Sequence, residues 1–184
     1  MKKRKKPHQA GRALQAAWDR AHAVSHQAKV SVFELADSKR SADRLYGLCL
    51  ARRRIEEGES PDRYLEMASG LVEDPDNNCR WQAAIIVGES IESDPGAVWN
   101  VVERFGDSVD EDMRAAIATI LLEHLLEHDF DTYLNKLKFE VDKGRHRFLD
   151  TLELCEYNLD DGDARRVKNY LRRARRGVPG DGVE

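Results

Sequence analysis

The sequence predicts an all-helical protein, an α-solenoid of about three helical hairpins, from three observations. Apolar residues recur at spacings of three and four through most of the chain, as one buried face of a helix requires. From residue 61 onward the chain repeats itself at a constant offset of 34 residues, a period typical of stacked helical hairpins. Five prolines and a 7% aromatic content disfavour a β-sandwich or barrel.

Two helices are predicted before the repeats. The first covers residues 9–29, and the second runs from Ser41, as a candidate N-cap, to Gly58. The predicted buried face of the first comprises Leu14, Trp18, Ala21 and Val24. The segment VSVFELADSKR, residues 30–40, is either a short turn of helix or a loop. Because the 34-residue offset places charged residues at apolar positions here, residues 9–60 are predicted to be a cap or a degenerate repeat.

Three hairpins are predicted over residues 61–94, 95–128 and 129–160. The offset aligns Pro61 with Pro95, each near a helix N-terminus, where proline is tolerated. It also aligns Ala68 with Val102, Leu71 with Phe105, Arg80 with Arg114, Ala84 with Ala118 and Ile86 with Ile120. In the more divergent third hairpin it reaches Tyr133, Phe139, Leu152, Cys155 and Leu159. Each hairpin has an apolar face that it cannot bury alone, so stacking on its neighbours is expected.

The string DPDNNCRWQAAIIVG, residues 74–88, contains Asp-Pro, an apolar residue followed by Arg, two alanines and an apolar-Gly pair. It resembles the core of HEAT repeats, which are armadillo-like α-solenoids. The resemblance implies antiparallel helix pairs stacked side by side, in which Asp74, Arg80 and Arg114 support the stack.

The resemblance covers residues 61–128 well and residues 129–160 loosely. The second repeat departs from it, with Ser108 where Asp is expected and Leu122 in the place of Gly88. The long surfaces of such a stack suit binding better than catalysis, so the expected function is a non-catalytic protein-binding or scaffold module. No cofactor is expected.

Charge is unevenly distributed along the chain. The totals are 30 basic and 34 acidic residues. Residues 1–6 contain five cations, and residues 165–184 contain seven cations and two acids, so 18 basic and 32 acidic residues remain between them, a net charge of −14. The body is therefore acidic and both ends are basic.

The C-terminal segment, residues 161–176, is predicted to form a basic amphipathic helix, followed by a flexible tail at 177–184. Its cations are Arg165, Arg166, Lys168, Arg172, Arg173, Arg175 and Arg176, and its narrow apolar stripe is Val167, Tyr170, Leu171 and Ala174. One interpretation is a capping helix that docks its stripe on the last hairpin. The alternatives are contact with nucleic-acid phosphates or with an anionic membrane surface.

The N-terminal segment, residues 1–8, is predicted to be a basic disordered tail. Its cations are Lys2, Lys3, Arg4, Lys5 and Lys6. They could join a nucleic-acid surface, solubilise the chain or form a nuclear address.

The stretch HLLEH, residues 124–128, matches the H-x-x-E-H pattern of some zinc peptidases. A metal-dependent hydrolase using His124, Glu127 and His128 is therefore a distant alternative. On a helical wheel the two histidines share an apolar face with Ile120 and Leu121, and no third ligand is marked. The favoured interpretation is structural: no catalytic residue or metal site is assigned, and the histidines are placed near the last turn of an inner helix.

Two tryptophans in the repeats have different expected roles. Trp99 aligns with Leu65 and is expected in the core, whereas Trp81 aligns with Ala115 and is a candidate exposed anchor for a protein partner. The three cysteines lie far apart, so neither a disulfide framework nor a zinc-knuckle spacing is available. No apolar run approaches the length of a membrane span, and a cytoplasmic location is expected.

Overall fold

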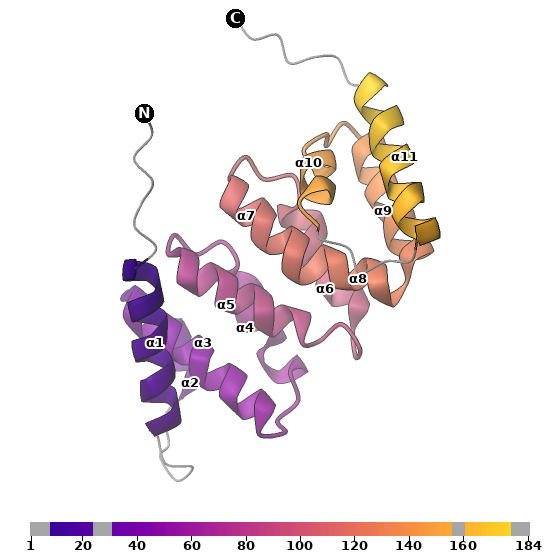
Figure 1. Cartoon of the computed structure of the whole chain (residues 1–184). Helices are drawn as coiled ribbons and strands as arrows, with labels where there is room; N and C mark the ends of the chain where they lie inside the picture. Colours follow the sequence, from indigo (N-terminus) through magenta and orange to yellow (C-terminus); the bar gives the residue numbers. More distant parts are fainter. Residues whose placement is uncertain (1–7, 24–30, 156–160, 178–184) are drawn as a thin grey trace, which may run out of the picture. The chain divides into compact units, whose positions relative to one another are not determined.

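The computed structural model describes residues 8–23, 31–155 and 161–177, and every regular element within those ranges is a helix (Figure 1). The predicted all-α class is thus confirmed. The length favours one domain, but the chain divides into two compact units, residues 1–90 and 91–184. The division falls close to the predicted junction between the first and second hairpins.

The first unit is organised around one central helix. Its helices are α1 (His8–Ala23), α2 (Val32–Ala36), α3 (Ser41–Glu56), α4 (Asp62–Leu71) and α5 (Asn77–Gly88). Helix α3 packs against α1, α2 and α5, and α4 packs against α5. Residues 45–51 of α3 are buried without interruption because neighbours cover this helix on several sides.

The segment before the first hairpin contains both predicted helices, with corrected boundaries. Helix α1 is described to Ala23, so Val24 and the rest of the predicted extension to residue 29 lie outside the described residues. The ambiguous stretch contains the short helix α2, and Ser31 caps it by accepting a hydrogen bond from the Glu34 amide. Ser41 is not the N-cap of α3, because it lies inside the first turn and Arg40 occupies the cap position.

The second unit contains the remaining helices. They are α6 (Pro95–Phe105), α7 (Glu111–Ala116), the π-helix η1 (Ile117–Leu122), α8 (Glu123–His128), α9 (Phe130–Asp142), α10 (Phe148–Glu153) and α11 (Asp161–Gly177). Residues 111–128 therefore form three consecutive helical elements, α7, η1 and α8. The central π-helix packs against α6 and α10, and four of its six residues are buried.

Equivalent loops in the two units repeat the same contacts 34 residues apart. Asp76 caps α5 by accepting from the amides two and three residues later, and Asp110 does the same for α7. The Asp74 carboxylate accepts a hydrogen bond from the Asp76 amide at 2.8 Å, and the Ser108 hydroxyl accepts one from the Asp110 amide at 3.1 Å. Ser108 thus preserves the bond within the loop although it carries no charge.

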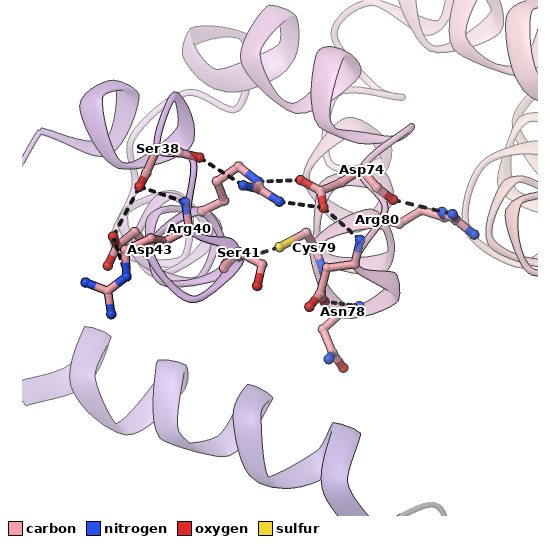
Figure 2. Close-up of polar contacts among 10 residues, drawn as sticks. Ser38, Arg40, Ser41, Asp43, Asp74, Asn78, Cys79 and Arg80 are labelled. Carbon is pink, nitrogen blue, oxygen red and sulfur yellow. Dashed lines mark hydrogen bonds and ion pairs between the residues drawn. The ribbon is translucent and has the colours of Figure 1, made fainter. Parts of the chain in front are cut away.

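The two repeat arginines also occupy equivalent positions. Arg80 donates to the Asp74 carbonyl at 3.4 Å, and Arg114 donates to the Ser108 carbonyl at 2.6 Å. Asp74 has a carboxylate, whereas Ser108 has a hydroxyl. The Asp74 carboxylate accepts two hydrogen bonds, of 2.5 and 3.0 Å, from Arg44 of α3. Figure 2 shows Asp74 between these contacts, with Arg80 on one side.

The third predicted hairpin contains α9 and α10. Tyr133, Leu152 and Cys155 are buried, as the offset predicts. Phe139 is not, because 61% of its surface is exposed, whereas Phe105 at the equivalent position of the second hairpin is buried. Leu159 lies outside the described residues.

Candidate binding surface on the C-terminal helix

Helix α11 attaches to the second unit through the predicted apolar stripe. Val167 is 2% exposed, and Tyr170, Leu171 and Ala174 are half-buried. The helix packs against α10 (Figure 1). Lys138 of α9 lies over the Tyr170 ring at 5.6 Å. The docking predicted for a capping helix is therefore present. Burial also raises the pKa of the Tyr170 hydroxyl to about 12.

Two of the seven cations of α11 bind acidic residues. Arg175 donates two hydrogen bonds of 2.7 and 2.8 Å to the Glu153 carboxylate and one of 2.7 Å to Asp150, both on α10. The two bonds to Glu153, and then the single bond to Asp150, raise the pKa of Arg175 above its ordinary value. All three side chains are between 43% and 47% exposed, so solvent screens these pairs and they add little stability each.

Arg166 forms the second attachment. It hydrogen-bonds Asp131 at the start of α9 and, at 2.8 Å, Asp163 in its own first turn. Its guanidinium carbon lies 4.7 Å from the centre of the Phe130 ring. On the helical wheel Arg166 and Arg175 flank the apolar stripe on opposite sides, which explains why these two reach the acidic residues of α9 and α10.

The other five cations of α11 lie outside the apolar stripe. They are Arg165, Lys168, Arg172, Arg173 and Arg176, all exposed. None of them has an acidic partner within the part of the chain that the structure describes; Arg172 bonds only the Asn169 amide oxygen, at 2.9 Å. Positions 165, 168, 172 and 176 follow one side of the helix over about 16 Å. We name these five residues the basic face.

A groove lies between α10 and α11. Its volume is ≈ 450 Å³, and it is lined by Leu152, Glu153, Ala164, Val167, Lys168, Leu171, Arg172 and Arg175. Its floor is largely apolar, and Lys168 and Arg172 of the basic face form part of its wall. The sequence offered no signal for this groove, because its two walls come from helices that only the tertiary structure brings together.

The basic N-terminal residues Lys2, Lys3, Arg4, Lys5 and Lys6 lie outside the described residues. The structure therefore places only the C-terminal half of the predicted nucleic-acid surface. Trp81, the candidate exposed anchor, is half-buried on α5, so part of its surface is covered and part is exposed. Trp99 lies in the core with 6% of its surface exposed, as expected.

The HLLEH stretch is oriented differently from the helical-wheel prediction. His124 and His128 are exposed, and Leu125 and Leu126 between them are fully buried. The π-helix before them is the reason: the Glu123 amide bonds the Ala118 carbonyl five residues earlier, so each residue advances less around the axis than in an α-helix. The prediction that the histidines share an apolar face is wrong.

His128 has an acidic neighbour, Glu92, but the two histidines are not part of a metal site within the described residues. Nδ1 of His128 lies 3.7 Å from a carboxylate oxygen of Glu92, whose side chain is 90% exposed. Within residues 8–23, 31–155 and 161–177, no three His, Cys, Asp or Glu side chains are gathered as a metal site requires.

Among the same residues no helix is both long and apolar enough to cross a membrane.

The three cysteines lie in the helical packing. Cys49, Cys79 and Cys155 are free and buried. Burial raises the pKa of Cys49 and of Cys79 to about 12, so both thiols stay protonated at neutral pH. Cys79 and Cys155 direct their Sγ atoms toward backbone carbonyls of Ser41 and Ala118, each at 3.5 Å. Their environment is that of packing residues rather than nucleophiles.

Comparison with protein-family models, curated proteins and solved structures gives no match.

Proposed function

We propose that the chain is a non-catalytic, HEAT-like protein-binding module that holds an acidic surface of a partner protein against the basic face of α11. The HEAT-like part of the proposal rests on the hairpins at the 34-residue offset and on their matching loop contacts. Asp76 and Asp110 form the same two-bond cap, and Arg80 and Arg114 donate to equivalent carbonyls. A stack of such hairpins would form a solenoid with long surfaces for binding.

The separation of cations on α11 carries the binding part of the proposal. A helix that served only as a cap needs its apolar stripe and the two flanking arginines, Arg166 and Arg175, which bond acidic residues of α9 and α10. The basic face adds nothing to that attachment. Five exposed cations on one helix raise the local positive potential, which attracts an acidic partner and speeds its association.

The test is capture of partners by two charge-matched baits. In one, Lys168, Arg172 and Arg176 are changed to Gln; in the other, Arg12, Lys39 and Arg147, which are exposed elsewhere, are changed to Gln. Both lose three charges, so non-specific attraction falls equally. We expect nuclease-treated extracts to yield proteins bound by the wild type and by the second bait but not by the first. Equal capture by both baits would refute the proposal.

Nucleic acid is the second candidate, because four cations of the basic face follow one side of α11 over about 16 Å, as a phosphate backbone could. If all four contact phosphates of duplex DNA, the logarithm of the association constant should fall against the logarithm of salt concentration with a slope of about −3.6. Electrophoretic shift of mixed DNA and RNA at two salt concentrations measures it. No shift at low salt would eliminate this candidate.

A further inference from the structure

The groove between α10 and α11 runs along one side of α11 for three helical turns. The residues that α11 contributes begin at Ala164 and end at Arg175, which corresponds to about 16 Å of helix. They form two parallel rows, one apolar (Ala164, Val167, Leu171) and one basic (Lys168, Arg172, Arg175). The opposite wall is the end of α10, Leu152 and Glu153.

The floor of the groove consists partly of core residues, and part of it is still exposed. Leu152 and Val167 are buried at 0% and 2% exposure, so the base of the groove belongs to the core of the second unit. Ala164 and Leu171 are only half-buried and line the open groove. Covering this apolar surface would stabilise a complex in proportion to the area removed from water.

The basic row is asymmetric, and this gives the groove a defined charge pattern. Arg175 is held at one end by Glu153 and Asp150, so it is engaged within the unit. Lys168 and Arg172 are exposed and have no acidic partner among the described residues. An occupant of the groove therefore meets an apolar floor on one side and two available cations on the other.

We propose that this groove binds an amphipathic helix of a partner protein, with its apolar stripe on Ala164 and Leu171 and with Asp or Glu residues beside that stripe facing Lys168 and Arg172. The proposal rests on the proposed protein-binding function and names the segment recognised. A groove of about 16 Å accommodates about three turns of helix, whose anchors recur at spacings of three, four and seven.

The apolar floor favours a peptide over nucleic acid. A phosphate backbone would satisfy Lys168 and Arg172 but would leave Leu171 and Ala164 uncovered. An acidic amphipathic helix satisfies both rows at once. Its charges also match the basic face beyond the groove, which increases the rate of encounter.

The experiment selects binders to the full chain from random displayed peptides of about 16 residues, long enough for about four helical turns. We expect the enriched peptides to combine Leu, Ile or Phe at spacings of three and four with Asp or Glu. The affinity of a synthetic copy is then measured for four single variants by fluorescence anisotropy.

The first two variants are a matched pair on adjacent residues. Arg172 lines the groove and Arg173 does not, yet both are exposed arginines of the same helix. Arg172→Ala should weaken binding roughly fivefold, and Arg173→Ala should weaken it less than about twofold. Equal losses in the pair would overturn the groove and leave an interaction driven by the basic face as a whole.

The other two variants test the floor. Leu171→Ser should weaken binding roughly tenfold by removing buried apolar contact. Ala164→Trp fills the groove without removing any packing, so it should abolish binding. This variant keeps the groove testable if Leu171→Ser unfolds α11. Binding that survives Ala164→Trp overturns the proposal.

The outcomes separate this inference from the proposed function. If the peptides bind but respond only to salt and to total charge, the groove is not the site and the acidic-partner function stands. If no peptide is enriched, the groove proposal fails, while the capture experiment with charge-matched baits still decides the function. Enriched peptides without acidic residues would also overturn the inference.

Discussion

Replacement of Glu140 by Gln tests how a buried carboxylate joins two helices of the second unit. Glu140 is 3% exposed on α9. Its two carboxylate oxygens accept hydrogen bonds of 2.7 Å, one from Lys143 and one from Arg145. Arg145 also donates to the Glu103 carbonyl of α6, so the carboxylate positions the side chain that ties α6 to the end of α9.

The size of the stability effect of Glu140→Gln follows from the exposure of Lys143 and Arg145. Lys143 is 45% exposed, so its pair with Glu140 is largely screened and contributes a few tenths of a kcal/mol. Arg145 is 29% exposed, and its charge-assisted bond contributes about 1.5–3 kcal/mol. Gln keeps the shape but loses the charge, so Glu140→Gln should lower the free energy of unfolding at pH 7 by about 2 kcal/mol.

The stability lost in Glu140→Gln should depend on pH. Burial by itself would raise the pKa of Glu140, but the hydrogen bonds from Lys143 and Arg145 outweigh it and hold the pKa below its ordinary value. The unfolded carboxyl titrates near pH 4.3, so this stabilisation is present above that pH and is lost as the pH falls through the lower folded pKa. The difference between wild type and Glu140→Gln should therefore narrow toward pH 3.

Urea denaturation followed by circular dichroism at pH 7, 5 and 3 measures both effects. Glu127→Gln, at an exposed position of α8, is the control for loss of one carboxylate and should change stability by less than about 0.5 kcal/mol. A Glu140→Gln effect no larger than the control at pH 7, or one that persists unchanged at pH 3, would refute the reasoning.

Two further predictions concern packing and the buried ion pair. A Cβ at Gly106 would lie 2.3 Å from the Phe148 ring and 2.7 Å from a backbone carbonyl, so Gly106→Ala should destabilise by about 2–3 kcal/mol. Gly70→Ala in α4 meets nothing within 4 Å and should stabilise by about 0.5–1 kcal/mol; thermal melts that rank the two variants the other way contradict the packing. Asp74→Ala leaves Arg44, which is 13% exposed, without its carboxylate and should cost about 3 kcal/mol; a double-mutant cycle with Arg44→Met that shows no coupling would remove the pair from the account.

Local chemistry made several features predictable. The apolar periodicity predicted the helical class and the helices that correspond to α1 and α3, because burial of one helical face is encoded within a few turns of chain. The 34-residue offset predicts that Arg80 and Arg114 are equivalent, and their contacts agree because each bond joins residues only six positions apart. The caps Asp76 and Asp110 are related by the same offset, and their bonds are equally local. Ser108 stands where Asp is expected, yet the hydrogen bond within the loop is kept because the Ser108 hydroxyl accepts from the Asp110 amide.

The orientation of HLLEH was not predictable by the same reasoning. The helical wheel assumes a constant rotation per residue, and the π-helix at 117–122, which ends two residues before His124, breaks that assumption. The packing of η1 against α6 and α10 is a tertiary property. Phe139 illustrates the same limit, because the offset gives it the position of the buried Phe105 but not the neighbours that would cover it.

By itself the sequence determined the helical class, the 34-residue offset between equivalent loops, and the division of α11 into an apolar stripe and a cationic majority, because these depend on residues close together in the chain. Only the tertiary structure decided which cations are engaged. It places Asp131, Asp150 and Glu153 within reach of Arg166 and Arg175, and it sets α10 beside α11 to form the groove. Ion pairs and grooves depend on distances between elements far apart in sequence, and helical periodicity contains no information about those distances.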